Sequence, residues 1–230
     1  MVTLAVLVAS CSTEPEAAST TAPPTTTTTT TPTTTPTTAA STTAQAPFEV
    51  PGGYEIIALE GENIRLALPQ SWVVVDLTRE GWEELLAEAL GAFPEAAELV
   101  GDEGQAIISQ GGLLLAYDVE NQDDDFVTNV NVLSAERGPL DDPEVIIPVL
   151  TDQLDQVGVV DAALDIVEVP IGDAIKASYG LPPETGFSHA AVQYYVFAPD
   201  TVYIVTFSTE NIVDLEFVFE TIMSTFDAID

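Results

Sequence analysis

Basic residues are scarce in this chain, which has four Lys and Arg against 38 Asp and Glu and a formal net charge of -34. Nucleic acids and anionic lipid headgroups are bound by basic faces that contact phosphate groups. The composition therefore predicts no nucleic-acid partner and leaves cations and basic proteins as candidates. A second interpretation is that the acidic surface only keeps the protein hydrated and dispersed in a salty medium.

Histidine and cysteine each occur once, at His189 and Cys11. A single cysteine excludes an internal disulfide, and one histidine with one cysteine cannot supply the ligand set of a zinc site. No G-x-S-x-G motif marks a nucleophile beside His189, and no glycine loop carries the lysine of a phosphate-binding loop. The sequence therefore predicts no enzymatic activity and no cofactor, with His189 as an ordinary strand residue.

Cys11 follows the apolar run MVTLAVLVAS, which ends in small residues as a secretory signal peptide does at its cleavage site. The segment VASC, residues 8–11, resembles the lipobox of bacterial lipoproteins, in which the cysteine is diacylated and becomes the mature N-terminus. No Lys or Arg precedes the run, so we expect translation to start upstream of Met1. The prediction is a signal peptide over residues 1–10 and a lipid anchor on Cys11, because two acyl chains hold a protein stably on a membrane. A free cysteine is the alternative.

Charge and aromatic rings are both missing from most of residues 11–47. This segment consists mainly of Thr, Pro, Ala and Ser, with no charged residue between Glu16 and Glu49 and no aromatic residue before Phe48. It cannot bury enough surface to offset its ordering entropy, and its prolines favour extended conformations. We predict a disordered Thr/Pro-rich spacer that holds the next domain clear of the membrane, in an extracytoplasmic location at the bacterial cell membrane.

A folded domain is predicted over residues 48–230, where apolar residues recur with the periods of strands and helices. The expected strands cover residues 54–59, 63–68, 72–77, 105–109, 112–119, 125–135, 164–170, 173–180, 188–198 and 201–208. The expected helices cover residues 79–93, 141–158 and 212–229. Neighbouring antiparallel strands with helices between them predict the α+β class, a mostly antiparallel sheet flanked by helices in an αβα sandwich.

Two short motifs lie in this domain, LPQSW at residues 68–72 and NVNV at residues 129–132. With the order of expected elements over residues 54–228, they resemble the PsbP-like αβα sandwich, and in particular the LpqN-type lipoproteins of actinobacteria. The resemblance implies a non-catalytic accessory or binding domain and supplies no catalytic residue. A domain of this fold is reused for binding rather than for one chemistry, so its function must be argued from its own side chains.

Acidic side chains are densest between residues 118 and 125. Asp118, Asp123 and Asp125 are candidate calcium ligands, because calcium takes oxygen ligands, although the glycine and distal glutamate of an EF-hand are missing. The alternative is a solvated acidic turn. With 38 acidic residues, carboxylate pairs arise by chance, so an undetected carboxylate-dependent hydrolase stays an open alternative without a specific pair to support it.

Aromatic residues gather on neighbouring strands of the second half of the domain. Strand alternation sends Tyr194 and Tyr195 to opposite faces of the sheet. Together with Trp72, they are the candidate contacts for a protein partner or an apolar ligand, with core packing as the competing interpretation. We therefore predict a monomeric, membrane-anchored binding lipoprotein. A structural envelope protein without a specific ligand is the other non-enzymatic alternative.

Overall fold

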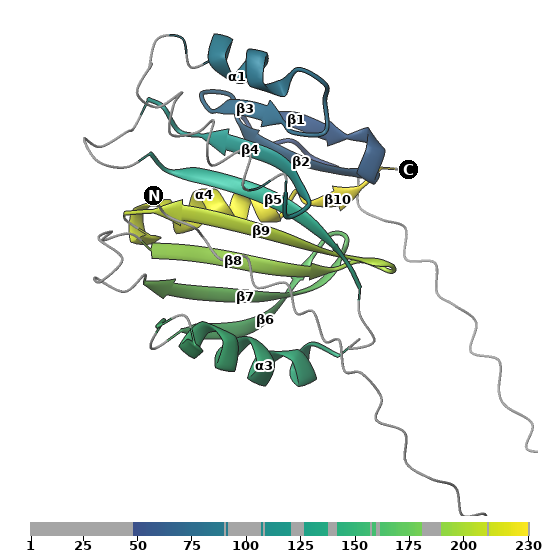
Figure 1. Cartoon of the computed structure of the whole chain (residues 1–230), viewed down its shortest axis with the longest axis vertical. Helices are drawn as coiled ribbons and strands as arrows, with labels where there is room; N and C mark the ends of the chain where they lie inside the picture. The colour runs from purple at the N-terminus through teal and green to yellow at the C-terminus, as the bar shows by residue number, and fades with distance from the viewer. Residues whose placement is uncertain are drawn as a thin grey trace, which may run out of the picture. The chain divides into compact units, whose positions relative to one another are not determined.

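The structure is a computed structural model that describes residues 48–89, 91, 107, 109–120, 127–137, 142–156, 158–159, 162–180, 190–210 and 212–229. Its main element is a seven-stranded antiparallel sheet in the order β3-β4-β5-β9-β8-β7-β6 (Figure 1). The strands are β3 (Val73–Asp76), β4 (Gly112–Tyr117), β5 (Asn129–Glu136), β6 (Ala163–Val169), β7 (Gly172–Gly180), β8 (Ala190–Phe197) and β9 (Thr201–Thr209).

A second, three-stranded sheet has the order β1-β2-β10. It consists of β1 (Tyr54–Leu59), β2 (Ile64–Pro69) and β10 (Asp227–Ala228), with the 3-10 helix η1 (Glu60–Glu62) between the first two strands. The expected single sheet is therefore two sheets. The expected C-terminal helix over 212–229 is also too long, because the chain turns after Met223 and its last residues pair with Arg65 and Ile64 of β2.

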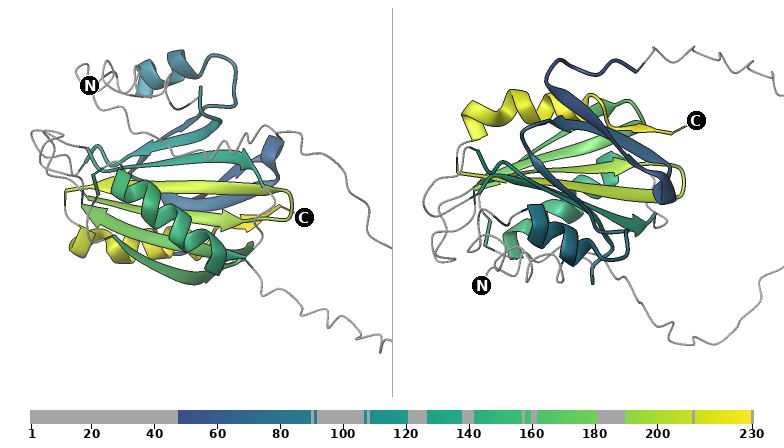
Figure 2. Two further views of the ribbon diagram at one scale, coloured as in Figure 1. Left: turned by 60° about the horizontal axis from the view of Figure 1, so that its bottom comes forward. Right: turned by 90° about the horizontal axis from the view of Figure 1, so that it is seen from above.

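In the described residues, three helices flank the sheets, which confirms the predicted α+β class. They are α1 (Trp82–Ala89), α3 (Pro143–Gln156) and α4 (Ile212–Met223). Figure 2 shows α4 and the small sheet on one face of the large sheet, and α1 and α3 on the other. At Ile107 the chain is helical, so the strand expected over 105–109 is not formed there.

Each face of the large sheet carries its own hydrophobic cluster, because successive strand residues point to opposite sides. On one face, Phe207 and Val205 pack with Phe219 and Ile222 of α4 and with leucines of the small sheet. On the other face, Ile175 and Ile204 pack with Leu150 and Leu154 of α3 and with Trp82 and Leu86 of α1. The sheet is thus covered on both sides, and functional groups on its strands lie under a helix or between helices.

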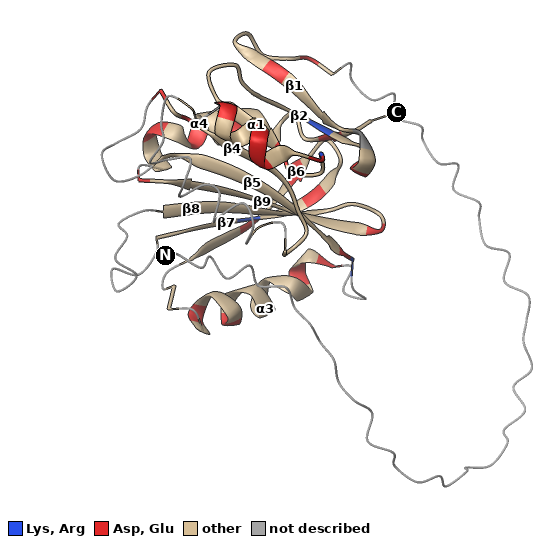
Figure 3. Cartoon of the chain, turned by 45° about the horizontal axis from the view of Figure 1, so that its top comes forward, with Lys and Arg blue, Asp and Glu red and all other residues tan. Residues whose placement is uncertain are grey.

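Acidic residues lie on α1, α3 and α4, and only a few basic residues accompany them (Figure 3). Of the 38 acidic residues, all except Glu14 and Glu16 belong to residues 48–230, which also contain the four basic residues, so this region has a net charge of -32. Within the described part of the chain, no helix is both long enough and apolar enough to cross a bilayer.

Candidate functional site

The three aromatic residues predicted to bind a partner lie in the interior of the domain. Trp72, Tyr194 and Tyr195 are 6%, 3% and 6% exposed. Trp72 and Tyr194 belong to the cluster under α4, whereas Tyr195 belongs to the cluster under α3, so the two tyrosines point to opposite faces as alternation predicted. The three side chains therefore form no common exposed surface, because helices cover both faces. Their role in binding stays a prediction.

The predicted calcium ligands are only partly within the described residues. Asp118 is buried at the end of β4, where its backbone N–H donates to the carbonyl oxygen of Thr128 over 2.9 Å. Asp123 and Asp125 lie outside the described residues, as do Cys11 and His189. Among the residues that are described, no three His, Cys, Asp or Glu side chains are grouped to hold a metal ion. Calcium binding by the acidic turn stays a prediction.

An exposed apolar pair lies on the outer side of α4. Val213 and Phe217 are 84% and 77% exposed, although Phe219 in the same helix is fully buried. Residues four apart lie on one side of a helix, so the two side chains form one patch. The helical spacing of the sequence predicts this helix only as a core element. In the sequence, the patch is indicated by the positions of both residues, which lie outside the apolar stripe formed by Leu215, Phe219 and Ile222.

Carboxylates surround this apolar pair. Asp214, Glu216 and Glu220 are exposed on the same helix, within one turn of Phe217. The ammonium group of Lys176, on β7, donates to Glu216 Oε1 over 2.9 Å and to Glu220 Oε1 over 3.1 Å. One positive charge against three negative charges leaves the surface acidic. We call Val213, Phe217 and these three carboxylates the α4 surface.

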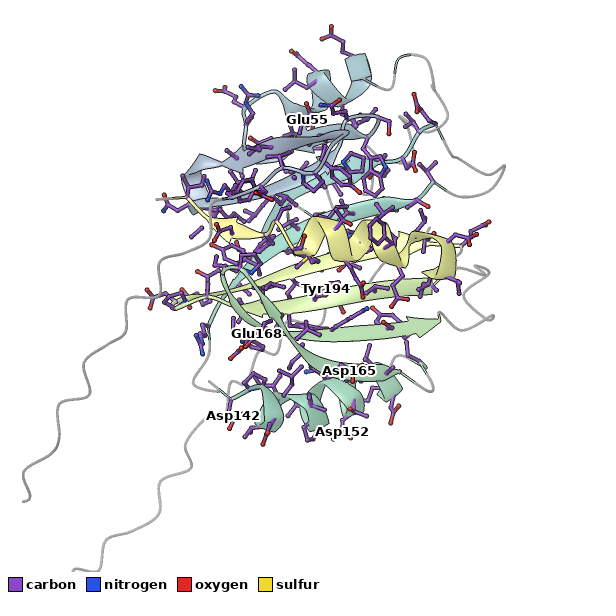
Figure 4. The ribbon with its side chains drawn as sticks, turned by 180° about the vertical axis from the view of Figure 1, so that it is seen from behind. Glu55, Asp142, Asp152, Asp165, Glu168 and Tyr194 are labelled. Atoms are coloured by element: carbon purple, nitrogen blue, oxygen red, sulfur yellow. The ribbon has the colours of Figure 1, made fainter. Side chains whose placement is uncertain are left out.

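Lys176 is held below the α4 surface. Its side chain is 14% exposed, whereas those of Glu216 and Glu220 are 50% and 57% exposed. Burial alone lowers the pKa of Lys176, but the hydrogen bonds to the two glutamates outweigh it, so its pKa is above the ordinary value. Lys176 lies directly across from Tyr194 on β8 and from Asp165 on β6, as both strand registers show. Figure 4 views this side of the domain and labels Tyr194 beside α4.

A second group of polar side chains lies on the opposite face of the sheet, where β5, β9 and β8 run between α1 and α3 (Figure 1). Asn131, Thr206 and Gln193 are direct cross-strand neighbours there, and all three are buried. Gln193 accepts the Tyr195 hydroxyl hydrogen over 2.7 Å and donates from Nε2 to Thr206 Oγ1 over 3.0 Å. We define the central polar patch as Asn129, Asn131, Gln193, Thr206 and the hydroxyl groups of Tyr179 and Tyr195.

The tyrosines of the central polar patch remain uncharged at neutral pH. Burial raises the pKa of Tyr179 to about 12, and burial also raises the pKa of Tyr195. The Tyr179 hydroxyl lies 3.4 Å from Gln193 Oε1, which therefore has both tyrosines as partners. Of this group, only Tyr195 is a candidate site residue from the sequence, because Asn, Gln and Thr in a strand usually face solvent.

No protein-family model and no curated protein matches the chain. Solved structures with a similar fold include PsbP (CyanoP) of the cyanobacterium Synechocystis, at 12% identity and a TM-score of 0.46, covering 78% of this chain and 94% of that one. The Ran-binding protein Mog1p of Saccharomyces cerevisiae is similar at 10% identity and a TM-score of 0.46, covering 77% of this chain and 96% of Mog1p. A protein of Bacteroides thetaiotaomicron is similar at 12% identity and a TM-score of 0.40, covering 77% of this chain and 48% of that one.

Proposed function

We propose that this chain is a cell-envelope lipoprotein whose folded domain binds a basic protein partner through the α4 surface and has no enzymatic activity. The observation that carries the proposal is the exposure of Val213 and Phe217 inside a ring of carboxylates. Large exposed aromatic residues are frequent among the side chains that dominate binding energy at protein interfaces. An apolar centre with a charged rim is the usual arrangement of such interfaces.

The charge of the α4 surface selects the type of partner. An anionic membrane would repel Asp214, Glu216 and Glu220, and a second copy of the domain would bring another net charge of -32 against them. A basic segment with an apolar side would instead cover Phe217 and pair with the carboxylates. The proposed partner is therefore a protein with Lys or Arg around an apolar contact residue.

The proposed location depends on the first 47 residues. A diacylated Cys11 would hold the chain at the membrane, and the Thr- and Pro-rich residues 12–47 would give the domain a long reach into the envelope. A tethered domain of this kind meets its partners at a high local concentration, so a modest affinity is sufficient for binding.

Replacing Cys11 by serine is expected to release the protein from the membrane. The thiol is the only acylation site that the lipobox provides, and serine cannot form the thioether. Metabolic labelling with a fatty-acid analogue, followed by membrane fractionation, measures the effect. If the Cys11→Ser protein is labelled and sediments with membranes as the wild type does, the anchor is assigned to the wrong residue.

Photo-crosslinking from position 217 tests the partner. With a photoreactive phenylalanine analogue in place of Phe217, we expect the full-length protein in its native cells to crosslink to a polypeptide whose attached peptide is basic. Val145 on α3 is 51% exposed and provides a matched control position, which should give no such product. The double variant Val213→Ser/Phe217→Ser should weaken binding of that polypeptide by about thirtyfold, as loss of an interface hot spot does.

Three outcomes would contradict this function. Crosslinks to lipid from position 217 would indicate membrane contact, and crosslinks to another copy of the chain would indicate self-association. Equal products from positions 217 and 145 would indicate contacts made only because both side chains are exposed. These outcomes concern only the α4 surface. The location of the protein is tested separately, by the Cys11→Ser variant.

A further inference from the structure

The edge of the large sheet at β6 has no strand beyond it among the described residues. β6 is the last strand in the sheet order and pairs only with β7, over seven positions without a register shift (Figure 1). In the described part of the chain, no backbone group of β6 is bonded outside this pairing. Alternate residues of an antiparallel strand direct their N–H and C=O groups away from the paired neighbour. The outer side of β6 therefore presents a row of open backbone donors and acceptors.

β6 has few of the features that protect edge strands from further pairing. Native edge strands are kept short, or they carry lysine, proline or a bulge. β3, at the opposite edge, has only four residues, and its Val75 is buried. β6 has seven residues, with no lysine, proline or bulge, and none of its residues is buried. The helix α3 covers the sheet face and not this edge, because its buried Leu150 and Leu154 pack in the same cluster as Ile175 of β7.

The centre of β6 consists of two apolar residues between two acidic residues, in the order Asp165, Ile166, Val167 and Glu168. Ile166 is 45% exposed, and both acidic residues are also exposed. Figure 4 labels the two acidic residues on this strand. Because successive residues point to opposite faces, each face of the edge has one apolar and one acidic side chain. A strand that pairs with this edge would meet the same combination on both of its faces.

Neither acidic residue of β6 is balanced by a cation of the sheet. Glu168 lies directly across from Asp173 of β7, which is exposed as well. Like charges in such a cross-strand pair destabilise a sheet, so the stability of the domain does not explain them. Asp165 lies across from Lys176, but the ammonium group of Lys176 donates to two glutamates of α4. Within the described residues, no ion pair includes Asp165 or Glu168. A cation on the open side of β6 would compensate each of them.

We infer that the outer edge of β6 binds an extended segment of a partner protein with the pattern basic, apolar, apolar, basic. Such a segment adds one strand to the large sheet, and its backbone pairs with the open groups of β6. It has Lys or Arg opposite Asp165 and Glu168, and apolar residues opposite Ile166 and Val167. The pattern reads the same from both ends, so a segment of either direction can supply it.

Charge disfavours a second copy of this chain as the occupant of the edge. Two paired β6 strands would bring Asp165 and Glu168 of each copy close to the acidic residues of the other, between domains that each have a net charge of -32. The inference is also independent of the proposed function. The α4 surface consists of helix side chains, whereas the edge of β6 is recognised mainly through its backbone.

Three short peptides test the inference on the full chain at about 0.15 M salt. The peptide TTRVVRTT carries the pattern, and TTQVVQTT lacks its charges. A third peptide is TTRVVRTT with both valine nitrogens methylated, which keeps the charges but cannot pair as a strand. We expect TTRVVRTT to bind at least about tenfold more tightly than the other two, as measured by fluorescence anisotropy. Its largest NMR shifts should occur at the backbone amides of residues 163–169.

Three variants locate the binding. In Asp165→Asn/Glu168→Gln, the affinity for TTRVVRTT should fall by about tenfold, because two cross-strand ion pairs are lost. Glu84→Gln/Glu88→Gln removes the same charge from exposed positions of α1, which lies beside the opposite edge of the sheet (Figure 1). It should change the affinity by less than about twofold, because salt screens distant charges. Val213→Ser/Phe217→Ser, which alters the α4 surface, should leave the affinity unchanged.

The melting temperature distinguishes weaker binding from damage to the fold. Asp165→Asn/Glu168→Gln removes the like-charge contact with Asp173, so without peptide it should melt at or above the temperature of the wild type. Equal binding of the methylated peptide, or an equal loss of affinity in Glu84→Gln/Glu88→Gln, would overturn the inference. So would peptide-induced shifts in α4 and not in β6, or self-association of the chain that shifts the same β6 amides.

Discussion

Replacing Phe219 by alanine is expected to lower the free energy of unfolding of the domain by about 3–5 kcal/mol. Phe219 is fully buried, and its ring stacks on that of Phe207 with 4.4 Å between the ring centroids. The substitution removes this contact and leaves a cavity between α4 and β9, which the surrounding rigid sheet cannot fill. Urea unfolding of the full chain, followed by tryptophan fluorescence, measures the change.

Phe217 provides the matched control for this prediction, because it lies two residues earlier in the same helix and is 77% exposed. Phe217→Ala should change the free energy of unfolding by no more than about 0.5 kcal/mol, as substitutions at exposed positions do. The same variant should bind the proposed partner more weakly than the wild type does. If Phe217→Ala destabilises the domain as much as Phe219→Ala, the outer side of α4 is packed against other parts of the chain and is not a free surface.

Replacing Arg65 by methionine is expected to destabilise the domain by about 3 kcal/mol, because it leaves a buried carboxylate without its cation. Arg65 Nη2 lies 3.0 Å from Asp227 Oδ2, and the side chain of Asp227 is only 5% exposed. This pair joins β2 to β10, so its loss should also release the last residues of the chain from the small sheet. Thermal unfolding measures the first effect, and amide hydrogen exchange of residues 227–229 measures the second.

Arg79 and Asp227 provide the controls for the Arg65 variant. Arg79→Met removes the same charge from an exposed position and should change stability by no more than about 0.5 kcal/mol. The double variant Arg65→Met/Asp227→Asn removes the isolated charge and should recover part of the lost stability. If the Arg65→Met protein is as stable as the Arg79→Met protein, the ion pair contributes no stability beyond the effect of the change in net charge.

Most strand positions could be predicted from the sequence, because alternation along a strand is a local signal. The strand expected over 54–59 has the same bounds as β1, and the hairpin around APDT joins β8 to β9 as expected. The end of α4 could not be predicted in this way. Phe226 continues the helical spacing of the apolar residues. However, the backbone N–H of Ala67 donates to Thr225 Oγ1 over 2.8 Å, and β10 pairs with β2, so the helix ends before the apolar spacing does.

The candidate sites were less predictable than the fold, for a physical reason. Asn129 and Asn131 alternate with Val130 and Val132, a pattern that usually indicates a strand with one solvent-exposed face and one buried face. The position of a strand in the sheet depends on its pairing with distant segments of the chain. The sequence of β5 alone therefore does not indicate that this strand lies in the middle of a sheet covered on both faces. For the α4 surface, the helical spacing already separates Phe217 from Phe219, so the apolar residues outside the core-facing stripe of the helix indicate this surface in the sequence.

The order of the large sheet has a consequence for how the domain folds. Strands β6 to β9 pair with their neighbours in the chain, as do β3 to β5, but the two groups join only where β5 pairs with β9. That pairing closes a long loop, which makes it slow compared with the formation of each hairpin. Asn131 and Thr206 face each other across this seam. We therefore expect the central polar patch to form late in sheet assembly, only after the two groups of strands have joined.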